Sequence, residues 1–255
     1  MRKKTPTNTN IRNDILEAID RAFPGKIVED TRDPDEEDYL CELYPRLQGE
    51  LSRINGAAIL YERDPSGLTG ESGEFDWGEV ADGEHEDPPE SDHWSSYHLL
   101  FLGLTDKSFR YGCDGSLMDE NGEEQDVEGQ GHIGCCVAVS LLAPFAIVKL
   151  SFLEEYEDGS YNYPDIEPSV FNPDMTPRDM DEHFREMFDD EGVQALHSLR
   201  DKAIQIIQTH PITVLPEEEL RKPVPWLRAG DETFVGKEIL GREITVQDAF
   251  FHRGL

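Results

Sequence analysis

Acidic side chains dominate this chain and come in blocks. Its 255 residues include 55 Asp and Glu against 23 Lys and Arg, a formal net charge of -32. Self-repulsion of this size opposes compaction, so the fold must keep the acids in water. Hydrophobic residues make up 37% of the chain, less than in a typical globular domain, and they concentrate in a few dense segments. We therefore predict a core that carries acidic loops.

Apolar residues at helical spacing predict three main helices and one short C-terminal helical turn. Their expected ranges are 10–23, 40–54, 191–209 and 247–251. Asn10 is the expected cap of the first helix, and Pro24 follows that helix as a stop. Pro45 lies inside the second pattern, so we expect a kink or two abutting helices there.

Dense apolar runs predict a series of strands. They cover residues 26–28, 57–62, 97–104, 108–113, 132–142, 145–153 and 212–215. We expect the strand at 108–113 to form a hairpin with the strand at 97–104. The strands at 132–142 and 145–153 are joined tightly and should form the middle of an antiparallel sheet. Acidic loops are expected at 63–94 and 114–130.

The order of these elements is helices, then strands, then helices. That order predicts an α+β fold with a central antiparallel sheet of about 5–6 strands, helices packed on it and long acidic loops. Residues 1–9 have no apolar side chain after Met1 and predict a disordered tail. Residues 10–255 show no linker between two self-sufficient cores, so we expect a single α+β domain.

Cysteine usage and hydropathy bear on the compartment. The four cysteines, Cys41, Cys113, Cys135 and Cys136, include no CxxC pair, and the last two should point to opposite faces of one strand. Reduced, buried thiols fit a reducing compartment. The longest apolar run, 135–150, is interrupted by polar residues and is too short to span a membrane. Because no apolar segment follows the basic N-terminus, we predict a cytoplasmic protein.

The charge restricts the class of partner. Nucleic acids and anionic membranes attract Lys and Arg, so direct binding to either is not expected. An acidic surface suits a basic protein partner, bound cations or a salt-rich solvent. Acidic loops that are simply solvated are the bland alternative.

The candidate partner-binding residues are the acids of the two acidic loops, together with one tryptophan. Acids around an aromatic side chain form an anchor with a charged rim, and aromatic anchors are frequent at protein interfaces. The predicted residues are Glu71, Glu74, Asp76, Trp77, Glu79, Asp82, Glu84, Glu86, Asp87, Asp119, Glu123, Glu124, Asp126 and Glu128. Trp226 lies in a proline-rich segment and is interpreted as part of a surface strap over the core.

A calcium loop of the EF-hand type matches the second acidic loop only in part. With Gly122 as the loop glycine, Asp119, Asn121 and Glu128 fall on ligand positions. The first ligand position would be Leu117, which cannot bind a cation. The flanking residues also predict strand and loop rather than helices, so the match is interpreted as accidental.

Other combinations of residues suit metal or nucleophile chemistry by type but not by spacing. Cys113 and His132 are a nucleophile and a base by type, yet no pattern selects them. No phosphate-binding, dinucleotide-binding, serine-hydrolase or zinc-protease motif occurs. We predict no cofactor and no metal, with a metal-dependent hydrolase that uses carboxylates and histidines as the alternative. The residues considered for a metal site are His85, Asp87, Asp92, His93 and His98.

In general character the chain resembles the immunity proteins of bacterial toxin systems. The shared features are acidity, an α+β pattern, the expected cytoplasmic location and the lack of catalytic motifs. The resemblance is one of character and covers no specific residues. It implies a non-enzymatic binding protein whose acidic surface engages a basic protein partner.

Overall fold

The computed structural model describes residues 11–28, 39–63, 95–118, 124–156, 161–162, 187–230 and 242–252. The helices are α1 (Asn13–Ala22), α2 (Tyr39–Leu51), α4 (Asp190–Ile207), α5 (Glu217–Leu220) and α7 (Val246–Phe250), with a 3-10 turn η1 (Lys107–Phe109). The strands are β1 (Ile27–Val28), β2 (Ala57–Arg63), β3 (Tyr97–Leu104), β4 (Arg110–Met118), β5 (Glu124–Ser140), β6 (Phe145–Tyr156), β7 (Tyr161–Asn162), β8 (Thr213–Val214) and β9 (Arg228–Ala229). The predicted α+β fold is confirmed. None of the described helices is both long and apolar enough to cross a membrane.

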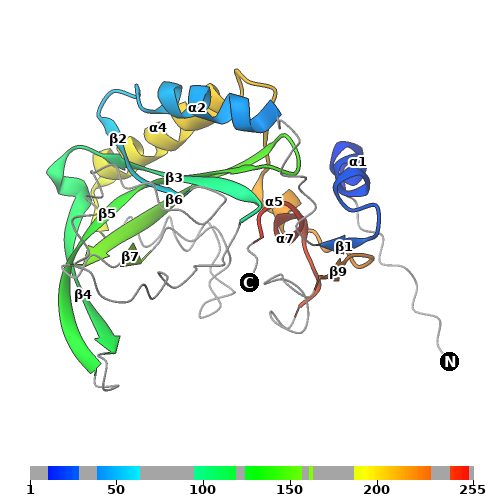
Figure 1. Ribbon diagram of the computed structural model, residues 1–255. Helices are drawn as coiled ribbons and strands as arrows, with labels where there is room; N and C mark the ends of the chain where they lie inside the picture. Colours follow the sequence, from blue (N-terminus) through cyan, green and yellow to red (C-terminus); the bar gives the residue numbers. More distant parts are fainter. Residues whose placement is uncertain are drawn as a thin grey trace, which may run out of the picture.

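One large sheet organises the molecule. Its strands follow the order β2-β3-β5-β6-β7, with β4 also paired to β5 and β8 to β6. All pairs in this sheet are antiparallel except β8 with β6. The long strands β5 and β6 lie in the middle, as the sequence predicts, and a tight connection joins them. Figure 1 shows α2 and α4 side by side over one face of this sheet.

The predicted hairpin between residues 97–104 and 108–113 is wrong. β4 pairs with β5 instead, on the same side of β5 as β3, and the two strands run in the same direction. The last pair of β3 is Gly103 with Gly134, and the first pair of β4 is Arg110 with His132. Between them the chain makes η1, whose cap Asp106 accepts a hydrogen bond from the backbone N–H of Ser108. A 17-residue β5 is long enough to pair with β3 and β4 end to end.

The predicted acidic loop at 114–130 is also wrong over most of its length. Residues 114–118 continue β4, and residues 124–130 begin β5. Asp, Glu and Gly are poor strand formers, which made the segment look like a loop. The pairing of β4 with β5, which continues outward from the rest of the sheet, overrides that weak local preference. Only residues 119–123 of this predicted loop lie outside the described residues. Of the other predicted loop, 63–94, Arg63 is the last residue of β2, and 64–94 lie outside the described residues.

The two faces of the sheet carry separate apolar clusters. One cluster joins the sheet to α2 and α4, and the other joins it to α1, α5 and α7. Cys135 belongs to the first cluster and Cys136 to the second, which confirms that these neighbours point to opposite faces. Both are buried thiols, and burial raises the pKa of Cys135.

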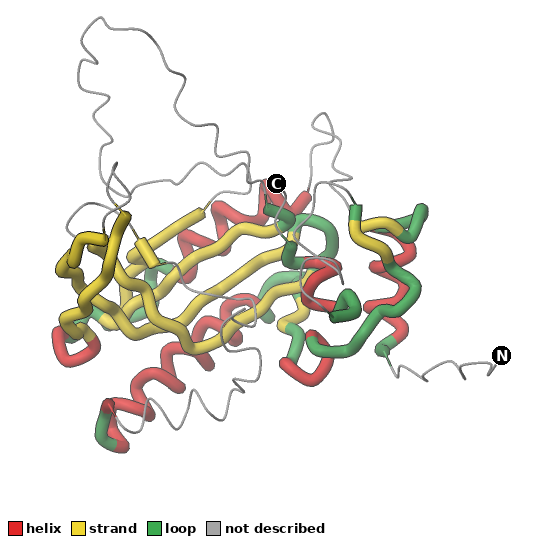
Figure 2. Tube along the Cα trace, turned by 90° about the horizontal axis from the view of Figure 1, so that it is seen from below, coloured by secondary structure: helices red, strands yellow, loops and turns green. Residues whose placement is uncertain are grey.

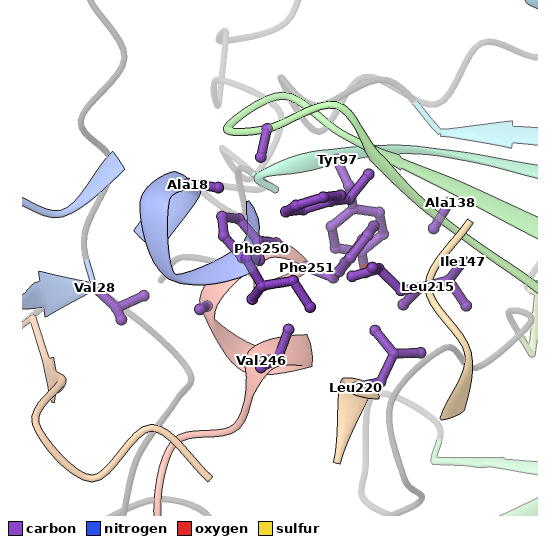
Figure 3. Packing of buried hydrophobic residues seen from close by; sticks show 14 of the residues in the cluster. Ala18, Val28, Tyr97, Ala138, Ile147, Leu215, Leu220, Val246, Phe250 and Phe251 are labelled. Atoms are coloured by element: carbon purple, nitrogen blue, oxygen red, sulfur yellow. The ribbon is translucent and has the colours of Figure 1, made fainter. Parts of the chain in front are cut away.

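The N- and C-terminal elements meet at one end of the sheet. β1 and β9 form a two-stranded parallel sheet, and α1 and α7 contribute to the same apolar cluster as the large sheet. Figure 2 shows these short elements gathered at one end of the long strands. In Figure 3 the rings of Phe250 and Phe251 lie beside Tyr97 of β3. Elements from both chain ends therefore complete a single core cluster.

Helix ends and interruptions differ in detail from the sequence prediction. The cap of α1 is Arg12 rather than Asn10, and its side chain pairs with Asp14 instead of capping a backbone N–H. Pro45 lies inside one helix, α2, which continues on both sides of it. The third helix is close to its predicted range and buries the expected stripe of Val193, Leu196, Leu199, Ala203 and Ile207.

A hydrogen bond between a histidine and a glutamate links the helices that cover the first face. Nε2 of His210, just after α4, lies 3.1 Å from Oε2 of Glu50 in α2. The hydrogen bond with His210 is the main cause that holds the pKa of Glu50 below its ordinary value of 4.5. Because the folded pKa is lowered, ionised Glu50 stabilises the fold above pH 4.5, and this contribution disappears as the pH falls through the lowered pKa.

We therefore expect the Glu50→Gln variant to be less stable than wild type at neutral pH. The two unfolding free energies should converge on acidification to about pH 3, below the reference pKa of a glutamate. Urea unfolding measured between pH 7 and pH 3 checks this, with the exposed Glu17→Gln of α1 as the matched control. Parallel pH curves for wild type and Glu50→Gln would contradict the role of this pair.

Candidate functional site

Three of the predicted partner-binding residues belong to the described part of the chain. Glu124, Asp126 and Glu128 lie on β5, and Glu128 is exposed. The others lie outside the described residues: Glu71, Glu74, Asp76, Trp77, Glu79, Asp82, Glu84, Glu86, Asp87, Asp119 and Glu123. The part of the candidate surface that the structure describes is therefore a strand pair rather than a loop. We call the paired segments 111–118 and 124–131 the acidic hairpin.

The register of the acidic hairpin sets like charges against each other. Asp114 of β4 is directly opposite Glu128 of β5, and the next pair on the same face is Ser116 with Asp126. Like charges at directly opposed positions destabilise an antiparallel pair, on the scale of roughly 0.2–1 kcal/mol for such cross-strand pairs. The hairpin thus carries charges that oppose its own stability.

The segment that forms the acidic hairpin contains no basic residue of its own. Residues 111–131 contain seven acids, Asp114, Asp119, Glu120, Glu123, Glu124, Asp126 and Glu128, and neither Lys nor Arg. Arg110 is the first base along the ladder toward the body, and it pairs with His132. Burial lowers the pKa of His132, and Arg110 lowers it further against the weaker opposing effect of Glu155. The lowered pKa disfavours the positively charged form of the His132 imidazole beside the charged Arg110.

Two tyrosine rings fill the space beside glycines on the other face of the hairpin. A Cβ atom added to Gly131 would lie 2.1 Å from Cζ of Tyr111. One added to Gly115 or Gly129 would lie 2.6 Å from the ring of Tyr156. The glycines therefore make room for rings that pack flat against the strands, which compensates for their own missing side chains.

Glu154 of β6 joins these two rings by hydrogen bonds. The hydroxyl of Tyr111 donates to Oε1 at 2.8 Å, and that of Tyr156 donates to Oε2 at 3.0 Å. Burial and the hydrogen bond to Glu154 raise the pKa of both tyrosines, that of Tyr156 to about 12. Both hydroxyls therefore stay protonated donors at neutral pH. Since Tyr111 lies on β4 and Glu154 on β6, this group spans three strands and fixes the base of the hairpin.

The register excludes Cys113 and His132 as a nucleophile and its base. Cys113 pairs with Gly129 and shares the face of Tyr111, two residues away. His132 pairs with Arg110, whose position is on the opposite face of the sheet. The two side chains therefore leave the sheet in opposite directions.

Residues considered for metal binding do not come together in the described part of the chain. No group of three or more His, Cys, Asp and Glu side chains there could hold a metal ion. His98 is buried on β3 and stacks on Tyr44, with ring centroids 3.6 Å apart. Leu117 and Glu128, at the ends of the EF-hand match, lie on paired strands and not on flanking helices. His85, Asp87, Asp92 and His93 lie outside the described residues.

Trp226 has the surroundings expected of a strap over the core. Its neighbours Val224 and Leu227 are buried in the cluster shared with α1 and α7. The Trp226 side chain itself is 37% exposed. The segment thus holds the core through its aliphatic residues and leaves the indole partly in solvent.

Sequence reasoning missed the Tyr111–Glu154–Tyr156 group. The sequence feature that pointed to this group was the pair of glycines at 129 and 131. In a strand they leave one face without side chains unless a neighbouring ring fills the space. The partners come from β4 and β6, so the group became visible only with the register.

Comparisons of the chain with protein-family models, curated proteins and solved structures found no match. Function is therefore inferred from the residues of this chain alone.

Proposed function

We propose that this protein is a non-enzymatic binding protein whose acidic surface engages a basic protein partner, as an immunity protein or inhibitor does. The observation that carries the proposal is the opposition of Asp114 and Glu128 across the acidic hairpin. Opposed acids destabilise the free protein. A Lys or Arg side chain placed between them turns the same arrangement into a favourable contact.

The base of the acidic hairpin supports this role. The hydrogen bonds from Tyr111 and Tyr156 to Glu154 connect β4 to β6 across β5. Figure 1 shows the two strands of the hairpin extending past the part of the sheet that α2 and α4 cover. Backbone that is already paired in a strand ladder loses less conformational entropy on binding than a flexible segment does, so charges on paired strands contribute more affinity.

The charge of the whole chain acts at longer range. A net charge of -32 attracts a cationic partner before contact and raises the association rate. This steering weakens with salt because the Debye length falls to about 8 Å at physiological ionic strength. The acids of 71–92 belong to the same proposal and would add to this field.

The experiment compares two variants with the same change in net charge. Asp114→Asn, Asp126→Asn and Glu128→Gln together neutralise three of the four acids of the acidic hairpin. Glu17→Gln, Glu191→Gln and Glu218→Gln together neutralise exposed acids on three separate helices. Binding of poly-L-lysine is measured by calorimetry at two salt concentrations. We expect the hairpin variant to bind about tenfold more weakly with a shallower salt dependence, and the control to stay near wild type.

The same hairpin variant is expected to be more stable than wild type. Removing the like-charge opposition should raise its unfolding free energy by roughly 0.2–1 kcal/mol, as measured by urea unfolding. Weaker binding together with higher stability distinguishes a binding surface from a structural one. Equal losses of affinity in the hairpin variant and the control would show that the charge acts generically, and the proposal would fail for this surface.

A further inference from the structure

The turn that joins α2 to β2 has an Asn–Gly pair at its centre (Figure 1). The backbone N–H of Ala57 donates to the carbonyl oxygen of Ile54 at 3.1 Å, so residues 54–57 form a β-turn. Gly56 has a φ of 78°, whereas Asn55 does not have a positive φ. This combination is that of a type II turn, whose third position needs the left-handed region and favours glycine.

The peptide unit between Asn55 and Gly56 is open to water. Both residues are exposed. In the part of the chain that the structure describes, the N–H of Gly56 donates to no backbone acceptor, because the hydrogen bond of the turn uses groups of Ile54 and Ala57. A Cβ atom added at Gly56 would meet no atom within 4 Å. The side-chain amide of Asn55 and the next backbone nitrogen are therefore adjacent, unshielded and accessible to solvent.

We propose that Asn55 is a modification site at which the chain deamidates itself, with water as the co-reactant. The nitrogen of Gly56 loses its proton and bonds to Cγ of Asn55, which closes a cyclic imide. The bond between Cγ and Nδ2 breaks, and Nδ2 leaves as ammonia with the proton that the backbone nitrogen lost. Glycine favours this attack because no Cβ atom shields its nitrogen or restricts its φ.

Hydrolysis of the imide gives two products. Water that opens the ring at Cγ leaves an ordinary aspartate at position 55. Water that opens the ring at the main-chain carbonyl carbon leaves isoaspartate, in which the chain continues through Cγ. Aspartate adds only a negative charge, whereas isoaspartate also adds a carbon atom to the main chain in front of Gly56.

The extra main-chain atom falls where the turn is held from both sides. The carbonyl oxygen of Gly56 accepts from the backbone N–H of Thr105 at 2.9 Å and from its hydroxyl at 3.2 Å. Ala57 is held at the same time by Ile54. Thr105 directly precedes Asp106, the cap of η1, after which β4 begins. Isoaspartate therefore loosens the anchor of the segment that leads from β3 into β4.

The experiment incubates the folded protein at physiological temperature in mildly alkaline buffer made with heavy-oxygen water. Peptide mapping by mass spectrometry follows position 55 separately from the second Asn–Gly pair of the sequence, at 121–122. Chromatography separates the aspartate and isoaspartate peptides. Asn13 is the internal control, because it is also exposed but precedes Asp14 at the start of α1. The variants are Asn55→Gln and Gly56→Ala.

We expect position 55 of wild type to lose ammonia, to incorporate a heavy oxygen and to give both products while Asn13 remains asparagine. Gly56→Ala should slow the change by about an order of magnitude, because its Cβ atom shields the attacking nitrogen. Asn55→Gln should stay unmodified at this position, since glutamine has to close a larger ring. An asparagine at position 55 that lasts as long as Asn13 would overturn the proposal.

Hydrogen exchange tests the structural consequence. The N–H of Thr105 should exchange faster in the purified isoaspartate form than in the Asn55→Asp variant, which carries the same added charge on an ordinary backbone. The N–H of Ser96, which donates to the carbonyl oxygen of His252 at 2.9 Å near the other end of β3, is the control and should not change. Equal exchange of Thr105 in the two forms would overturn the proposed loosening.

Discussion

A Phe250→Ala variant is expected to lose about 3–5 kcal/mol of unfolding free energy, the range found when buried aromatic residues are cut to alanine. Phe250 of α7 is fully buried. Its ring lies 6.4 Å from that of Phe23, just after α1, and 5.1 Å edge-on from that of Phe145 in β6. The substitution therefore opens a cavity where the N-terminal helix, the C-terminal helix and the sheet meet.

Urea unfolding followed by circular dichroism measures this loss. Ile27→Ala is the matched control, because Ile27 belongs to the same end of the molecule but is 37% exposed; its change should stay within about 0.5 kcal/mol. A loss below about 1 kcal/mol for Phe250→Ala would contradict the packing described for this ring.

The same curves test the prediction that residues 10–255 form a single domain. One domain predicts that Phe250→Ala moves a single cooperative transition to lower urea without changing its slope. A separate early transition confined to the terminal elements would show that this end of the molecule unfolds by itself. The single-domain prediction would then be wrong.

A Gly134→Ala variant is expected to lose about 2–3 kcal/mol, as overpacking in a rigid site does. A Cβ atom at Gly134 would lie 2.1 Å from the backbone oxygen of Leu102 in β3. A flexible side chain moves aside at small cost, but this oxygen belongs to the ladder between β3 and β5. The added methyl group must therefore separate the two strands at Gly103 and Gly134, the last pair of the β3–β5 ladder.

Gly112→Ala is the matched control for this change. Gly112 lies on the neighbouring β4, is exposed, and has no atom within 4 Å of an added Cβ. Its stability should change by less than about 0.5 kcal/mol. Thermal and urea unfolding of the pair check the difference. Equal stabilities of the two variants would mean that β3 and β5 approach less closely than described.

These core variants and the hairpin variant act in opposite directions on stability. Phe250 and Gly134 are both buried, so they contribute to the fold and not to a surface for a partner. The opposed acids of the hairpin reduce stability and lie on a strand pair whose residues Gly112, Glu128 and Gln130 are exposed. The binding role that we propose for the acidic hairpin accounts for acids at positions where they lower stability.

Hydrophobic pattern predicted the elements whose burial follows from their own apolar residues. β3 begins and ends where the apolar run at 97–104 does. α4 covers Asp190–Ile207 against the predicted 191–209. The buried positions of α4 follow the helical period, whereas β3 is a continuous apolar run that is buried on both faces. In both, the local sequence contains the whole signal.

The candidate site was predicted only in part, because its chemistry depends on pairing. The sequence located the acids at 124, 126 and 128 but interpreted them as a loop. Neither the opposition of Asp114 and Glu128 nor the group around Glu154 follows from composition, since each requires knowing which residues face each other. The buried guanidinium of Arg63 had no sequence signal, because its contacts with Tyr97 depend on the pairing of β2 with β3.

The sequence by itself determined the α+β class, the stripe of α4, the central place of β5 and β6 and the separation of Cys135 from Cys136, because these depend on local periodicity and strand alternation. Only the tertiary structure decided that β4 continues along β5 after β3 instead of turning back on it. It also decided that both chain ends complete one core and that an arginine lies buried beside Tyr97. Each of these depends on contacts between residues far apart in the chain, for which no local pattern carries information.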